Sequence, residues 1–494
     1  MAINSQGTSV WRFSQALMLT ACLVGASGWL VATPISIQAQ TSQESLLANL
    51  KNPDPIVRRK AAKELGEKRF REVSGALAQA AQTDTDPEVR ANALESLGRL
   101  KDEAVIPAII DTLKDLSPQV RRAAVRALVS YYIESDIGFV FAERKGLNVL
   151  NPFLDTDGPT IVEPYVQVDP RMTEALAQMM RDDAEVSLRR AGVRALGVLR
   201  ADSQAPALIG ALDSDPNLRI DIFRVFIKLG RTEYGEYAIP YFSSDDREIR
   251  AQAIATAGLL RTHKAVESLN SVYRLGEDKR GFKANINDFF KQVPERQRIT
   301  LEALSQIGDP ASKDIFEGNL RRDEDRRQWA NEGLARMGDT SFVETISRNR
   351  LKEGSGRVKL AQAFALYKLG RPEYLDAIIK ELEAITLGDQ ATGYLYEVLS
   401  PADLHGPVRV ATTGATVKIL KVLGVIGTSE SIPVMEPLLR DTNARVVNAA
   451  NLAIQRIKLR EQYQQGQLPV KPPLPQPQSP SRPRRTNPKD GGQS

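Results

Sequence analysis

The chain has 494 residues, which is enough for about three globular domains or one elongated repeat array. One cysteine and two histidines nearly exclude zinc, iron–sulfur and thiol chemistry, so we expect no metal and no cofactor. The formal net charge of +5 lies entirely in the two ends of the chain, and residues 40–465 sum to zero, which indicates no nucleic-acid partner.

The first 39 residues have the composition of a signal peptide. Arg12 precedes an apolar stretch at residues 16–33, and Ala39 ends a sequence that a signal peptidase can cut. We therefore expect export to the periplasm or cell envelope of a bacterium. Two alternatives stay open. Cys22 lies in a lipobox-like sequence and would be lipidated, or residues 16–33 would remain as an uncleaved membrane anchor.

A repeat with a period near 31 residues fills most of the chain. An acidic or hydroxyl residue, a proline, an aliphatic residue and an arginine recur in order, as in Asp86-Pro87-Glu88-Val89-Arg90. The arginine position, which we call the repeat marker, falls at residues 58, 90, 121, 189, 219, 250, 297, 327, 359, 416 and 447. Self-similarity at such a period predicts a stack of like units and not several globular domains.

One repeat unit, residues 86–114, indicates two short amphipathic helices. Asp86 is a good N-cap, because its carboxylate can accept hydrogen bonds from the free backbone N–H groups of the first turn. Pro87 suits the first helical position, where the missing N–H would have no partner in the helix. The first helix places an apolar stripe on one face, and the second does the same at i, i+3, i+4 and i+7; the stripes are Val89, Ala93, Leu97 and Leu100, then Ile106, Ile109, Ile110 and Leu113. Such a pair of helices cannot enclose its own apolar face, so it must stack on copies of itself.

This pattern resembles the HEAT-repeat family, and its period most resembles the short bacterial form called PBS-lyase HEAT-like repeats. The resemblance implies an all-α fold, a right-handed α-solenoid of about eleven helix pairs over residues 45–460. The marker departs from the family pattern at Gln297, Thr416 and Val447. With layers about 9 to 10 Å apart, the units would form a curved, monomeric rod on the order of 100 Å long.

The marker arginines predict a structural ladder of paired charges. An acidic or hydroxyl residue stands four residues before each of them, and we expect each acid to pair with an arginine one repeat away. The arginines are Arg58, Arg90, Arg121, Arg189, Arg219 and Arg250, and the residues before them are Asp54, Asp86, Ser117, Glu185, Asp215 and Asp246. Such a ladder fixes the register of stacking and leaves little free charge for phosphate.

Three insertions interrupt the period, at residues 136–169, 276–293 and 386–412. Insertions in solenoids lie in loops and often carry the binding function. The first insertion also has the pattern of a small β excursion. Their aromatic side chains and one histidine either pin the loops to the solenoid or anchor a protein partner; they are Phe139, Phe141, Phe153, Tyr165, Phe282, Phe289, Tyr394, Tyr396 and His405.

Residues 461–494 form a proline-rich, basic tail that cannot bury apolar area and is expected to be disordered. No catalytic motif is found, since the chain has no nucleophile elbow, Walker loop or zinc-protease signature. We therefore expect an exported, non-catalytic scaffold that binds another protein. The alternative, which rests on the family resemblance alone, is a lyase-like protein that acts on a tetrapyrrole chromophore protein.

Overall fold

A computed structural model describes the backbone of residues 34–133, 162–278 and 286–466, with side chains at all of these positions except 34–41, 71 and 276–294. Within these ranges the protein is helical and contains no strand, which confirms the all-α solenoid. The expected β excursion falls mainly on residues 134–161, outside the described ranges. Its described part, residues 162–169, is irregular.

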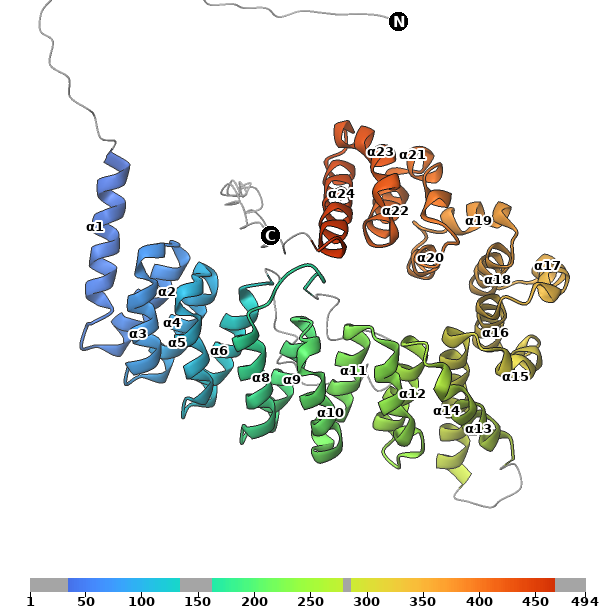
Figure 1. Cartoon of the computed structure of the whole chain (residues 1–494), viewed down its shortest axis with the longest axis horizontal. Helices are drawn as coiled ribbons and strands as arrows, with labels where there is room; N and C mark the ends of the chain where they lie inside the picture. The colour runs from blue at the N-terminus through green and yellow to red at the C-terminus, as the bar shows by residue number, and fades with distance from the viewer. Residues whose placement is uncertain (1–33, 134–161, 279–285, 467–494) are drawn as a thin grey trace, which may run out of the picture.

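All eleven repeat markers fall in helices that form one layer, which we call the inner layer, with the third insertion between α18 and α22. Figure 1 shows this layer on the inner side of a strongly curved arc. The helices are α2 (Pro55–Glu67), α4 (Pro87–Leu100), α6 (Pro118–Ser130), α9 (Val186–Val198), α11 (Arg219–Leu229), α12 (Arg247–Leu259), α14 (Ile286–Ile307), α16 (Glu324–Met337), α18 (Gly356–Lys368), α22 (Thr413–Ile426) and α24 (Ala444–Gln464).

A second layer of shorter helices covers the outer side of the arc. Figure 1 shows α15 and α17 outside α16 and α18. The outer layer consists of α3 (Ser74–Thr83), α5 (Ile106–Asp111), α8 (Pro170–Asp182), α10 (Ala205–Ser214), α13 (Val266–Asp278), α15 (Lys313–Asn319), α17 (Val343–Lys352), α19 (Leu375–Ile379) and α23 (Ile432–Met435). Two 3-10 helices, η7 (Thr232–Ser243) and η15 (Glu436–Arg440), belong to the same layer.

Two further segments complete the described fold. Helix α1 (Pro34–Asn49) packs on α2 and spans the expected cleavage point after Ala39. The third insertion contains α20 (Gly388–Leu395) and α21 (Pro407–Val410), and it separates α18 from α22. This insertion is therefore part of the helical stack.

The helix starts follow the expected chemistry. Asp86 accepts hydrogen bonds from the backbone N–H groups of Glu88 (2.9 Å) and Val89 (3.0 Å), so its carboxylate caps α4. The apolar stripe of α4 is buried, and so are Ile106, Ile109 and Leu113 of the second helix, while Ile110 is half-buried. The unit therefore hides its apolar faces between the two layers and its neighbours, as its sequence predicts.

Glycine lets the inner helices approach closely. A Cβ on Gly258 of α12 would lie 2.6 Å from the Cα of Ala303 on α14, which is closer than real Cβ atoms come to another atom. Glycine in a helix interior costs about 1 kcal/mol relative to alanine. The tight stacking of α12 on α14 is the reason for glycine at this position.

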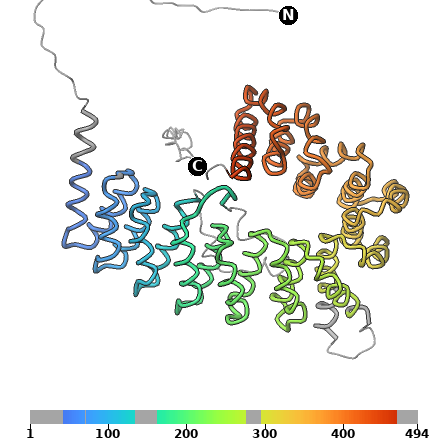
Figure 2. Tube along the Cα trace, viewed as in Figure 1, coloured from blue at the N-terminus to red at the C-terminus, as the bar shows by residue number. Residues whose placement is uncertain are grey.

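The buried core has two parts. One apolar cluster runs from Leu46 to Leu334, and a second runs from Ala335 to Ile457, so that the break falls within α16. Figure 2 shows the chain turning upward in this region and returning, so that α24 comes back toward the segment before α8. The arc is thus more strongly curved than the rod expected from the period.

Candidate partner-binding site

The arginine ladder is a set of ion pairs between successive repeats. Arg58, Arg90, Arg121 and Arg189 each lie 2.7 to 2.9 Å from a carboxylate in the next repeat turn; the partners are Asp84, Asp115, Asp183 and Asp215. Both side chains of each pair are less than one fifth exposed. These arginines are therefore engaged in the stack and are not offered to a ligand.

The acid of a rung differs from the expected one in part of the ladder. Arg58 pairs with Asp84 and not with Asp86, because Asp86 caps its own helix and binds Arg59 at 2.6 Å. The hydrogen bond from Arg59, and then those from the backbone N–H groups of Val89 and Glu88, lower the pKa of Asp86 to about 2. The carboxylate two residues before the cap is the one that remains free to meet the arginine.

The expected pairing is not found for two marker arginines among the described residues. The Nε of Arg219 donates to the carbonyl of Leu212 (3.1 Å), and its guanidinium lies over the Tyr241 ring. Arg250 donates to the backbone carbonyls of Ser244 and Asp245. The residue six positions before the next marker, which is Asp84 or Asp115 in the first rungs, is Ser244 in the rung of Arg219. Its side chain carries no charge that could pair with Arg219.

In the third insertion, Tyr394 is buried and belongs to the core. It is 5% exposed, and its ring stacks on Phe364 with centroids 4.2 Å apart. Its hydroxyl donates to Oε1 of Glu332 at 2.5 Å. Burial first, and then the Glu332 carboxylate, raise the pKa of Tyr394 well above its usual value. The residue pins the insertion to α16 and α18 and presents no surface to a partner.

A buried charged network surrounds this contact. Arg336 lies 3.3 Å from Glu332 and 2.9 Å from Glu397, and Glu397 also pairs with Arg261 at 2.9 Å. Although burial opposes it, the Arg336 cation holds the pKa of Glu397 below its usual range. Glu397 follows α20, so these pairs tie the third insertion to α16 and to the repeat of α12.

One carboxyl beside this network is shifted in the opposite direction. Burial raises the pKa of Glu302 to about 8, and the Glu332 carboxylate adds to the shift. Glu302 on α14 is therefore mostly protonated at neutral pH.

Within the described chain, no group of three or more His, Cys, Asp and Glu side chains is arranged to hold a metal ion.

Two other predicted residues lie on or near the surface of the third insertion. Tyr396 is 43% exposed. Nε2 of His405 lies 2.9 Å from the Ser431 hydroxyl, which joins the insertion to the next repeat. Of the two, Tyr396 is the one that offers an aromatic surface.

The first insertion returns to the solenoid beside its carboxyl-terminal helix. Glu163 forms an ion pair with Arg456 of α24 at 2.8 Å. Tyr165 is 9% exposed, and burial raises the pKa of its hydroxyl, while the cations of Arg456 and Arg460 oppose this shift. The described end of this insertion thus bridges the two arms of the arc.

The other predicted residues fall on parts of the chain that the structure does not describe. Cys22 and the side chain of Phe289 on α14 lie outside the described residues, and the same is true of Phe139, Phe141, Phe153 and Phe282. No helix within the described chain is both long and apolar enough to cross a membrane.

The sequence reasoning missed a groove between α22 and α24. Its volume is about 290 Å³, and its lining is mainly apolar with three cations and no acidic residue; it is lined by Val417, Leu420, Lys421, Gly424, Arg445, Asn448, Ala449, Leu452, Ala453 and Arg456. Leu452 is 48% exposed although it stands in a helix that packs well on its other face. Its position outside the buried stripe of Val446, Ala450, Ala453 and Ile457 is the signal that was available.

The fold and the ladder define an α-solenoid of stacked helical repeats. Residues 44–131 match the family model of HEAT repeats, which confirms the resemblance for this part of the chain. A comparison with curated proteins found no match.

Solved structures with similar helical stacks share little sequence with this chain. An engineered protein is 15% identical and covers 84% of this chain and 98% of its own, with a TM-score of 0.34. Kap95p bound to RanGDP is 13% identical and covers 87% and 59%, with a TM-score of 0.41. The CpcE–CpcF phycocyanin lyase of Nostoc sp. PCC7120 is 16% identical and covers 70% and 100%, with a TM-score of 0.22. At these scores none of them carries an argument about function.

Proposed function

We propose that this protein is a non-catalytic scaffold that binds a protein partner in the groove between α22 and α24. The observation that carries the proposal is the combination of an apolar floor with the exposed side chain of Leu452. Apolar surface that a folded chain leaves uncovered beside a concavity is typical of a protein-binding site.

The charges of the rim select the kind of partner. Lys421 and Arg445 line the groove, and within the described chain neither is paired with a carboxylate. Arg456, the third cation, is held by Glu163. An apolar segment that carries its own carboxylates would fill the floor and neutralise the two open cations, so we propose an acidic, amphipathic segment of the partner.

Two substitutions of exposed leucines test the groove. Leu452→Asp places a charge in the apolar floor, whereas Leu351→Asp makes the same change on the outer helix α17, where Leu351 is 87% exposed. A partner captured by crosslinking in the native compartment should be lost with Leu452→Asp and kept with Leu351→Asp. Equal capture by the two variants contradicts the groove as the binding site.

We propose further that the scaffold works after export. The apolar leader and the neutral body of the chain support this location. The mass of the mature amino terminus tests it: a chain that begins at Gln40 indicates cleavage, a diacylated Cys22 indicates a lipoprotein, and a chain that begins near Met1 indicates an anchor or a protein that is not exported.

A further inference from the structure

The rungs at Arg58, Arg90 and Arg121 share one geometry. In Arg121, Nη1 donates to the carbonyl of Asp115, six residues earlier, at 2.9 Å, while Nε donates to Asp183 at 2.7 Å and Nη2 to the same carboxylate at 3.0 Å. Arg327 binds Glu353 through the same two atoms, and its Nη1 donates to the carbonyl of Arg322, five residues earlier. One edge of the guanidinium thus fixes the local turn, and the other edge grips an oxyanion from the next repeat.

The rung at Arg250 keeps the hydrogen bonds from Nη1 to the local backbone carbonyls and lacks the ion pair with the next repeat. Its Nη1 donates to the carbonyls of Ser244 and Asp245, six and five residues earlier. The side chain is buried, with 7% of the residue exposed. No carboxylate of the described residues meets its Nε–Nη2 edge. In four complete rungs the acid stands six residues before the next marker, and here that position holds Lys291.

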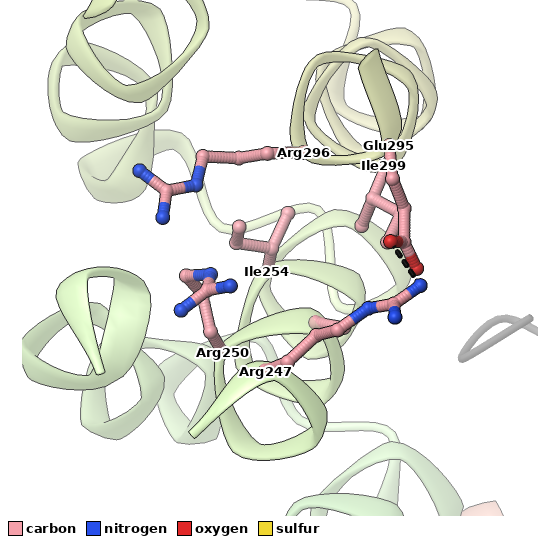
Figure 3. A pocket seen from close by; sticks show the side chains of 7 residues that line it. Arg247, Arg250, Ile254, Glu295, Arg296 and Ile299 are labelled. Atoms are coloured by element: carbon pink, nitrogen blue, oxygen red, sulfur yellow. Dashed lines mark ion pairs between the residues drawn. The ribbon is translucent and has the colours of Figure 1, made fainter. Parts of the chain in front are cut away.

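A second cation stands beside this open edge. Figure 3 shows Arg296 of α14 and Arg250 of α12 extending to the same side of Ile254, while Arg247 and Glu295 meet in an ion pair on the other side. Burial, and then the Arg296 cation, lower the pKa of Arg250. Glu295 also lines this pocket but is paired with Arg247, and among the described side chains no acid forms an ion pair with Arg250 or Arg296.

We infer that this pocket binds a phosphate-class dianion, either inorganic phosphate or a phosphate monoester, between Arg250 and Arg296. A guanidinium edge binds two oxygens of such a group at once, as it binds the carboxylates of the other rungs. A dianion neutralises both cations, whereas a monocarboxylate neutralises one. The bound group takes the place of the missing acid and completes the stack between α12 and α14.

Calorimetric titration of the full-length chain tests the site with three probes: inorganic phosphate, phenyl phosphate and acetate at matched ionic strength. We expect saturable binding of one or both phosphates and much weaker binding of acetate. Preference for phenyl phosphate points to a monoester as the natural ligand, and preference for inorganic phosphate points to the free ion. No saturable phosphate binding, or acetate that binds as tightly, overturns the inference.

Two variants separate the site from general charge effects. Arg296→Gln removes a guanidinium that forms no ion pair with an acid of the described residues, so folding should be retained, and we expect phosphate affinity to fall by about tenfold or more. Arg274→Gln removes an exposed arginine of α13 that pairs with Asp314, and it should leave the affinity unchanged. Equal affinity in wild type and Arg296→Gln, or an equal loss in both variants, overturns the inference.

Discussion

The guanidinium of Arg456 on α24 lies 2.8 Å from the carboxylate of Glu163, which belongs to the insertion of the third repeat. The two residues come from opposite arms of the arc, and Figure 2 shows how the chain curves to bring these arms together. Arg456 also lines the groove between α22 and α24. The closure of the arc and the end of the groove therefore share one side chain.

Breaking this pair should open the arc with little loss of stability. Each side chain is about one third exposed, and ion pairs of this kind contribute roughly 0 to 1 kcal/mol. We expect Glu163→Gln to increase the radius of gyration in small-angle scattering while the melting temperature stays close to that of wild type. The charge swap of Glu163→Arg with Arg456→Glu should restore the compact value, and a radius unchanged in all variants would show that other contacts close the arc.

A rung of the ladder should matter far more than a surface pair. Arg90→Ala leaves the Asp115 carboxylate, which is 11% exposed, without its cation, and such losses cost about 3 kcal/mol. Arg99→Ala removes an exposed pair with Glu95 and should cost less than about 1 kcal/mol. Because long repeat arrays do not unfold in one step, hydrogen exchange of α4 is the suitable measurement. Similar protection in both variants would contradict a structural ladder.

The hydroxyl of Tyr394 should stabilise the third insertion. Tyr394→Phe keeps the stacking on Phe364 but leaves Glu332 with one hydrogen bond fewer in a buried site, at a cost of about 1 to 3 kcal/mol. Tyr396→Phe removes a hydroxyl from an exposed ring and should be nearly neutral. Thermal unfolding compares the two variants, and an equal effect would show that the Glu332 contact contributes little.

Glu302 should make the stability depend on pH. Because its pKa rises from 4.5 to about 8 in the folded state, the folded protein binds this proton more tightly, and the stabilisation present below pH 4.5 is lost as the pH rises toward 8. Glu332 and Asp325 face it with negative charge, and Arg298 and Arg357 with positive charge. Thermal unfolding from pH 5 to 8 should show a smaller loss in Glu302→Gln than in wild type.

A matched control isolates that carboxyl. Glu344→Gln changes an exposed glutamate of α17, and its stability should follow the wild-type pH dependence. If Glu302→Gln also follows the wild-type curve, the carboxyl is ionised in the folded protein at neutral pH.

The repeat itself was predictable because each unit obeys local rules. Asp86 caps the helix that its position predicts, and the buried residues Val89, Ala93 and Leu97 follow the helical period. These features need only the residues of one unit and its neighbours. All eleven markers therefore fall in helices of the inner layer.

The long-range features were not predictable from the period. The Arg456–Glu163 contact depends on the summed rotations of many repeats, and small changes per repeat move the two arms far apart. In the sequence, Tyr394 is one of several aromatic residues of the third insertion. Only its contact with Glu332 shows that it is part of the core. The groove was missed because the sequence does not show how far apart α22 and α24 lie, although Leu452 stands outside the buried stripe of α24.

The most direct test of the scaffold proposal places a photo-crosslinking amino acid at position 452 of the full chain and, as control, at position 351. Irradiation in the native compartment should give one discrete crosslinked protein from position 452, with an acidic, amphipathic segment at the crosslinked site, and none from position 351. Absence of any product from position 452, or the same products from both positions, would contradict a partner-binding groove between α22 and α24.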